Sequence, residues 1–172
     1  MLCCFAASGF SLNAETRTCE GSPITGDLTL AKQWDNCRGI IKNVDNVGGT
    51  YEGGFVRGRF HGQGKFTSKS NVIYEGQFQN GLRHGAGKVS TPTFSASGNW
   101  LKGKPHGKAT EIFKDGSKFS GIYKNGKRNG PGRLDFSGGG FFEGLFKDGR
   151  ASSGFMAYRN GDTYEGELSP KG

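Results

Sequence analysis

The sequence predicts an all-β fold: an extended, twisted, single-layer antiparallel sheet made of successive β-hairpins. Three observations support it. A motif that begins at Tyr51 recurs every 22 or 23 residues, with further copies starting at positions 74, 96, 119, 142 and 164. Turn dipeptides such as Asn80-Gly81 stand inside the copies, and each copy has a glycine between two strand positions that are mostly aromatic. A fixed period of this length indicates a repeat array, in which each unit contacts its neighbours.

The composition argues against both an ordinary globular core and disorder. Only 33% of the 172 residues are hydrophobic, and 32 residues are glycine. The chain nevertheless has 14 phenylalanines, which a disordered linker would lack. The net charge of +8 bears on partners and solubility rather than on the fold.

Residues 1–14 form a short apolar stretch. It ends at Leu12-Asn13-Ala14, a small-residue site of the kind that signal peptidase cleaves, but the usual positive opening segment is missing. A signal peptide and an apolar tail therefore both stay open. The first predicts export to a periplasmic or extracellular space, and the second a cytoplasmic or membrane-peripheral location. No run approaches the ~20 apolar residues of a membrane-spanning helix.

The four cysteines fall into two pairs. Cys3 and Cys4 would leave with a cleaved leader. Cys19 and Cys37 would then be an even pair in an oxidising compartment, which indicates one disulfide that stabilises the fold by roughly 3 kcal/mol. In a cytosolic protein they would instead be two free thiols.

A lead-in, residues 15–50, precedes the array, residues 51–172. Gly39 precedes the first copy by the same 12 residues that separate Gly62 from the second copy. Residues 34–50 are therefore predicted to form a degenerate capping hairpin, because terminal repeats are usually atypical.

Each copy in the array is predicted to form one hairpin. In the first copy, one strand runs from Tyr51 to Phe55, the turn centres on Gly58, and the second strand runs from His61 to about Phe66. Side chains alternate between the two faces of a strand, so the two aromatic positions share a face with the glycine between them. We expect rings to lie over glycines of neighbouring strands. The predicted repeat-packing residues are Tyr51, Gly53, Phe55, Tyr74, Gly76, Phe78, Gly98, Trp100, Phe119, Gly121, Tyr123, Phe142, Gly144, Phe146, Tyr164 and Gly166.

Several copies depart from the pattern. The third has Ala96 in place of the first aromatic residue and Ala109 in place of a glycine, so its packing should differ. The fourth has Asn129 in place of the histidine, and the fifth, over residues 149–154, lacks His-Gly and is one residue short. The sixth stops soon after its first strand, so the chain is either a fragment or ends in a capping strand.

The motif Tyr-Glu-Gly-x-Phe-x-x-Gly-x-x-His-Gly-x-Gly resembles the MORN repeat (membrane occupation and recognition nexus). The resemblance covers residues 51–172 and, more loosely, residues 39–50. It implies a curved, twisted antiparallel sheet of hairpins with non-catalytic roles, namely protein interaction, self-association and a contested binding of phospholipids. Residues 19–23 and 34–39 resemble the lead-in of exported bacterial members of this family.

We predict no catalytic, cofactor or metal site. His61, His84 and His106 share one repeat position, but equivalent positions in successive hairpins lie about 9.6 Å apart. That is too far for ligands of one zinc ion, so we expect structural histidines. Two Gly-x4-Gly-Lys stretches, at Gly98 and Gly121, lack the Ser or Thr and the helix that a phosphate loop needs. A flat sheet also offers no pocket for a small-molecule substrate.

The first turns of the hairpins carry the best functional signal. Basic residues gather between the last aromatic residue of the first strand and the histidine position, with Asp148 as the only acid. These turns should project from one edge of the sheet and form a basic rim suited to an anionic surface. Lysines at exposed edges also protect against aggregation, so a partner surface and a solvated rim both stay open. The candidate residues are Arg57, Arg59, Arg83, Lys102, Lys104, Lys124, Lys127, Arg128, Lys147 and Arg150.

We therefore expect a non-enzymatic scaffold whose partner is an unidentified protein or a second copy of the chain. The alternative is peripheral binding to anionic lipid or envelope surfaces through the basic rim. Nucleic acid is not expected, because the aromatic residues are committed to packing and export would exclude it. A further hypothesis is an accessory domain of an enzyme, since similar repeats precede catalytic domains in other proteins.

Overall fold

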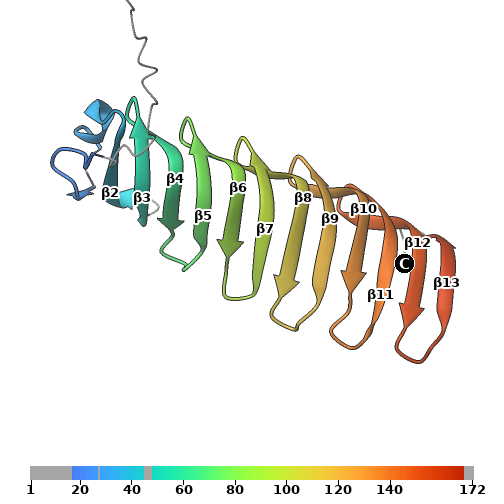
Figure 1. Ribbon diagram of the computed structural model, residues 1–172. Helices are drawn as coiled ribbons and strands as arrows, with labels where there is room; N and C mark the ends of the chain where they lie inside the picture. The colour runs from blue at the N-terminus through green and yellow to red at the C-terminus, as the bar shows by residue number, and fades with distance from the viewer. Residues whose placement is uncertain (1–16, 27, 45–47, 169–172) are drawn as a thin grey trace, which may run out of the picture.

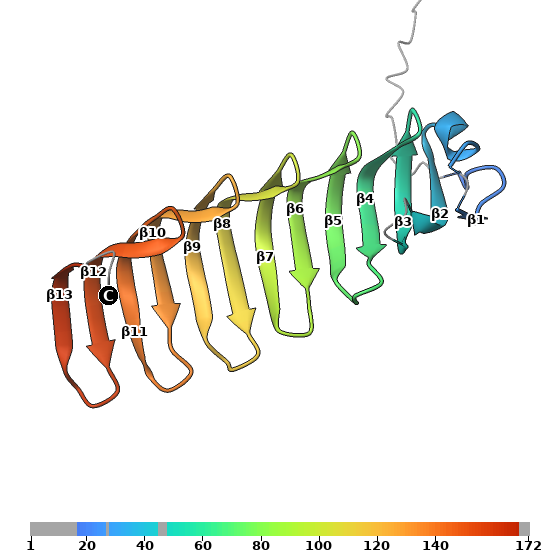
Figure 2. The same cartoon turned by 180° about the vertical axis from the view of Figure 1, so that it is seen from behind.

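A computed structural model describes residues 17–26, 28–44 and 48–168, so the predicted signal peptide or tail lies outside the described residues. They form one open sheet of 13 strands in sequence order, antiparallel except for the β1–β2 pair (Figures 1 and 2). The predicted all-β array of successive hairpins is thereby confirmed. The elements are β1 (Ile24–Thr25), the 3-10 helix η1 (Ala31–Gln33), β2 (Cys37–Val44), β3 (Gly49–Val56), β4 (Arg59–Thr67), β5 (Ile73–Gln79), β6 (Leu82–Ser90), β7 (Phe94–Leu101), β8 (Lys104–Phe113), β9 (Lys118–Lys124), β10 (Lys127–Asp135), β11 (Gly140–Lys147), β12 (Arg150–Tyr158) and β13 (Thr163–Glu167).

The strands are longer than the sequence pattern suggested. In the first hairpin, pairing begins at Thr50 and Thr67 and continues to Val56 and Arg59, which close the turn. The motif residues mark only the part of each strand that packs against other rings. The ladder beyond them consists of backbone hydrogen bonds, which carry no signature in the side chains.

The His-Gly dipeptide produces a β-bulge. Gly53 pairs with Gly64, but the next residue, Gly54, pairs with His61, so the register shifts by two residues. Gly62 lies inside this shift with φ of +67°, a left-handed conformation that favours glycine. The fifth hairpin, which lacks His-Gly, has a smaller shift at the same place.

Rings over glycines hold the hairpins together. The Tyr51 ring is fully buried and covers the backbone of Gly53 and Gly64, where a Cβ would lie 2.5 Å from the tyrosine oxygen. Tyr51 Oη also donates a hydrogen bond to the carbonyl of Gly54 at 3.1 Å. The edge of Phe55 meets this ring with centroids 5.3 Å apart. A single sheet thus builds its core on one face, here called the aromatic face.

The rings touch edge to face along most of the array. The series runs through Tyr51, Phe78 and Tyr74 to Trp100, with centroids 5.1–5.3 Å apart. It stops at the third hairpin, where Ala96 provides no ring. The buried residues therefore form two clusters, and the second of them begins at Phe119.

The opposite face carries rows of polar side chains over the first two hairpins. Glu52, Lys65, Glu75 and Lys88 lie opposite one another on successive strands, and Lys65 Nζ is 2.9 Å from a Glu75 carboxylate oxygen. Both side chains of that ion pair are about half exposed, so solvent screens it and it adds little stability.

The lead-in covers the N-terminal edge of the sheet. Cys19 and Cys37 form a disulfide and are buried. The Trp34 ring lies over Gly39, 4.8 Å from the Phe55 centroid, and its Nε1 donates to the carbonyl of Glu20 at 2.8 Å. Within residues 34–50, Cys37–Val44 form one long strand, β2, which pairs with β3 from its first residue, Gly49.

Candidate functional site

The turn that joins the two strands of each hairpin is here called its tip. The five tips, between β3 and β4, β5 and β6, β7 and β8, β9 and β10, and β11 and β12, are held in line along one edge of the sheet, the upper edge in Figure 1. In the second to fifth tips a glycine N–H donates to a carbonyl of the preceding hairpin, and in the first tip the Gly58 N–H donates to the Trp34 carbonyl of the lead-in at 2.8 Å. The Gly81 N–H donates to the Phe60 carbonyl at 2.9 Å, and the Gly103 N–H donates to the Arg83 carbonyl, the equivalent position of the second hairpin, at 2.8 Å. The tips of the fourth and fifth hairpins make the same bond. The tips therefore form a regular rim whose spacing is fixed by the backbone.

Eight of the ten candidate basic residues are exposed on this rim. With Asp148 they give the tips a net charge of +7. Lys127 Nζ lies 3.6 Å from the Asp148 carboxylate, but both side chains are more than 60% exposed, so the pair is weak. The exposed rim cations are Arg57, Arg59, Lys102, Lys104, Lys124, Lys127, Lys147 and Arg150.

Arg83 and Arg128 do not belong to the rim, contrary to the prediction. The guanidinium carbon of Arg83 lies 4.6 Å from the Trp100 ring centroid, and that of Arg128 lies 4.1 Å from the Phe119 ring. Both side chains are half-buried on the aromatic face. Cation–π contact and burial of the aliphatic stem explain why they turn inward.

The position of these arginines in the repeat explains their role. Phe60 occupies the equivalent position in the first hairpin and stacks on Tyr51, with ring centroids 3.7 Å apart and nearly parallel planes. Arg128 likewise covers the Phe119 ring of its own hairpin, and Arg83 lies over both the Tyr74 ring of its own hairpin and the Trp100 ring of the next. An alignment of the copies places Arg83 and Arg128 at the position of Phe60. That alignment would have predicted that both side chains pack on rings, whereas the count of basic residues in the turns assigned them to the rim.

Arg128 also takes part in a half-buried polar cluster. It forms an ion pair with Glu111, whose side chain is 19% exposed, and its Nε lies 3.3 Å from Tyr123 Oη. Burial acts to lower the pKa of Arg128, but hydrogen bonds to Glu111 and Tyr123 outweigh it and raise the pKa above its usual value. Burial raises the pKa of Tyr123. Glu111 stands where the other hairpins have an apolar residue. It pairs with Ala96, the residue that takes the place of the first aromatic residue in this copy.

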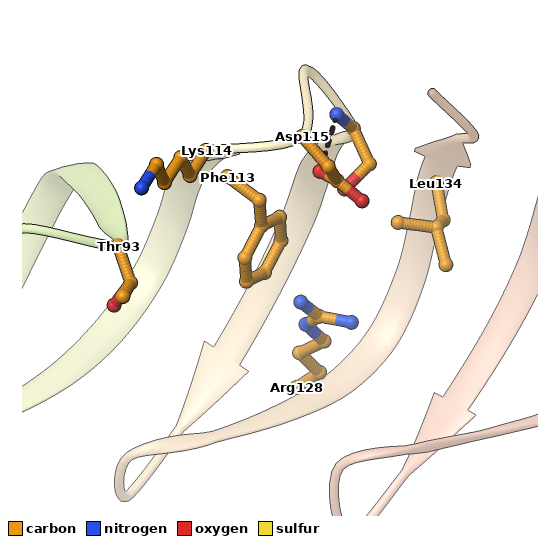
Figure 3. A pocket seen from close by; sticks show the side chains of 7 residues that line it. Thr93, Phe113, Lys114, Asp115, Arg128 and Leu134 are labelled. Atoms are coloured by element: carbon orange, nitrogen blue, oxygen red, sulfur yellow. Dashed lines mark hydrogen bonds between the residues drawn. The ribbon is translucent and has the colours of Figure 1, made fainter. Parts of the chain in front are cut away.

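Two cavities flank this cluster at the break in the aromatic series. One, of about 460 Å³, is lined by Phe113, Asp115, Leu134 and Arg128, with the guanidinium pointing toward the phenylalanine (Figure 3). The other, of about 310 Å³, lies between Phe113 and the tips of the fourth and fifth hairpins. Both are open, and the charges of Arg128 and Glu111 offset each other, so neither cavity has a clear preference for a charged ligand.

A groove crosses the opposite face over the third to fifth hairpins. Two hollows of about 420 and 560 Å³ share Ser120 and Pro131 and so run into one another. Leu145, 51% exposed, belongs to one wall, and Ile112, 50% exposed, lies on the same face two residues beyond Thr110 of the other hollow. The wall residues on the polar side are Ser97, Thr110, Ser120, Arg133 and Glu143. Over the third hairpin, hydroxyl side chains stand in place of the charged row, and the row resumes at Arg133, whose guanidinium nitrogen lies 3.0 Å from a Glu143 carboxylate oxygen.

The histidines do not come together. His61 lies at the start of a bulge, and His84 and His106 occupy the same place in the next two hairpins. Within the described residues, no group of three His, Cys, Asp or Glu side chains is placed to hold a metal ion. The bulge glycine that follows each histidine accounts for the dipeptide without a ligand.

Comparison with protein-family models finds the MORN repeat at residues 51–72, 74–93, 97–118 and 119–141. A comparison with curated proteins finds no match. None of the helical residues in the described part of the chain forms a segment long and apolar enough to cross a membrane.

Proposed function

Since this chain belongs to the MORN-repeat family, we propose that it acts as a non-catalytic scaffold that binds a protein partner or a second copy of itself. The family is one of binding repeats, and an extended sheet offers a long surface for a partner. The disulfide fits an oxidising compartment, so export is part of the proposal.

The observation that carries the proposal is the groove on the opposite face. The aromatic face is largely occupied by its own rings and their covering side chains, so it has little surface left to offer. The opposite face exposes Leu145 and Ile112 beside a groove that crosses several strands. Exposed apolar residues beside polar ones are typical of protein interfaces.

A charge at Leu145 should therefore weaken association. We expect Leu145→Asp to reduce the affinity for the partner, or for a second copy, at least about tenfold. Gln77→Asp is the matched control, because Gln77 occupies the same repeat position in the second hairpin, far along the sheet. Sedimentation velocity over a concentration series measures self-association, and pull-down with each variant as bait measures partner capture.

Concentration-dependent association, or capture of a partner, that is lost in Leu145→Asp and kept in Gln77→Asp would support the proposal. Equal behaviour of the two variants in both experiments would contradict it.

A second candidate function, peripheral binding to an anionic membrane surface, is favoured by the rim. Eight exposed cations on aligned tips would lie together against acidic headgroups, where each basic residue near the surface contributes about 1 kcal/mol. Such binding should fall steeply as salt rises, because exposed charges are screened.

A further inference from the structure

We infer that Leu82 and Leu101 form an apolar anchor at the centre of the basic rim, which inserts into the headgroup region of an anionic bilayer. The inference rests on the second candidate function and names the residues that would make contact with the lipid. It starts from two large apolar side chains that lie in solvent at the tips of adjacent hairpins.

The two leucines are close neighbours in the fold. Leu82 pairs with Gln79 and closes the second tip, whereas Leu101 pairs with Lys104 and closes the third. They stand on β6 and β7, which are adjacent strands. The hydrogen bond from Gly103 to the Arg83 carbonyl holds the two tips together at this point. Leu82 is 49% exposed and Leu101 is 39% exposed.

Cations flank the leucines on both sides. The residues that close the turns follow one another along the rim, because all tips are aligned. Arg59 closes the first tip, Lys104 shares the third with Leu101, and Lys127 helps to close the fourth. Each of these side chains is exposed. The two leucines therefore lie among cations, with Lys102 and Lys104 on the same tip as Leu101.

This combination suits a bilayer better than other anionic partners. A soluble polyanion would be attracted by the cations but would gain nothing from the leucines. At a bilayer the cations meet acidic headgroups while apolar side chains reach the acyl boundary, as in interfacial amphipathic helices. A row of projecting tips also fits a deformable surface more easily than the rigid surface of a folded protein, in which binding hot spots fill preformed pockets.

The test compares flotation of the full chain with vesicles of phosphatidylcholine alone and with added phosphatidylserine, at low and physiological salt. Wild type should float only with the acidic vesicles. The double variant Leu82→Ser, Leu101→Ser should partition at least about tenfold more weakly, since two side chains no longer gain from burial. Tyr158→Ser is the matched control, because Tyr158 is 49% exposed, as Leu82 is, but lies at the end of β12 where the chain turns to β13, on the edge opposite the rim.

The possible results distinguish insertion of the two leucines from attraction by the rim cations. A double variant that binds as well as wild type would overturn the anchor, while wild-type flotation would still support the charged rim. No wild-type flotation at low salt would remove the second candidate function and the anchor together. Retention of wild type on a heparin matrix but not on acidic vesicles would assign the rim to a soluble polyanion and also overturn the anchor. Circular dichroism of every variant establishes that it is folded.

Discussion

Replacing Gly64 with alanine is expected to lower the free energy of unfolding by about 3 kcal/mol, the upper end of the usual cost of overpacking a core. The new Cβ would lie 2.5 Å from Tyr51 Oη and 2.8 Å from its ring carbons. Tyr51 has no room to move away, because it is fully buried and stacked beneath Phe60. Urea unfolding followed by circular dichroism measures the change.

Gly138→Ala is the matched control for this substitution. A Cβ at Gly138 meets nothing within 4 Å, and its φ is not in the left-handed region. Alanine there should leave stability unchanged or raise it slightly, because it restricts the unfolded chain. Equal losses for Gly64→Ala and Gly138→Ala would mean that ring-over-glycine packing is not what holds the hairpins together.

Loss of the Cys19–Cys37 disulfide is expected to cost roughly 3 kcal/mol. The bond closes a loop between residues that are 18 apart in sequence, and on the chain-entropy model it restricts the unfolded state accordingly. In the folded state it ties the lead-in to β2, where the N–H of Cys19 also donates to the Arg38 carbonyl at 2.7 Å. Reduction should therefore loosen the covering of the first hairpin before the rest of the array unfolds.

The double variant Cys19→Ala, Cys37→Ala separates the disulfide from other effects of a reducing agent. It should match reduced wild type in its urea midpoint and should not respond to dithiothreitol. If oxidised and reduced wild type unfolded at the same urea concentration, the disulfide would have no part in stabilising the N-terminal edge.

Most of the fold could be predicted from the sequence because each hairpin is a local unit. The period, the turn dipeptides and the alternation of ring and glycine all act within one copy or between neighbours. The third copy's departure from the motif also predicted a change in packing. Ala96 has no ring, and the aromatic series breaks at this copy.

The candidate site was harder to predict because it depends on where side chains turn. Arg83 and Arg128 look like rim residues when charges are counted, but their long apolar stems and planar guanidinium groups pack on rings. Leu82 and Leu101 are 19 residues apart in sequence, and only the pairing of β6 with β7 brings them together. The groove on the opposite face likewise depends on side chains from several strands.

A continuous rim requires that the hairpin tips are held in line, and amide hydrogen exchange followed by NMR tests this. The N–H groups of Gly81, Gly103 and Gly126 donate to carbonyls of the preceding hairpin, whereas those of Gly116 and Gly161 donate only within their own turns. We expect the three tip amides to exchange as slowly as strand amides and much more slowly than the other two. Tip amides that exchange as fast as Gly116 and Gly161 would contradict an aligned rim, and with it the anchor and the charged surface built on it.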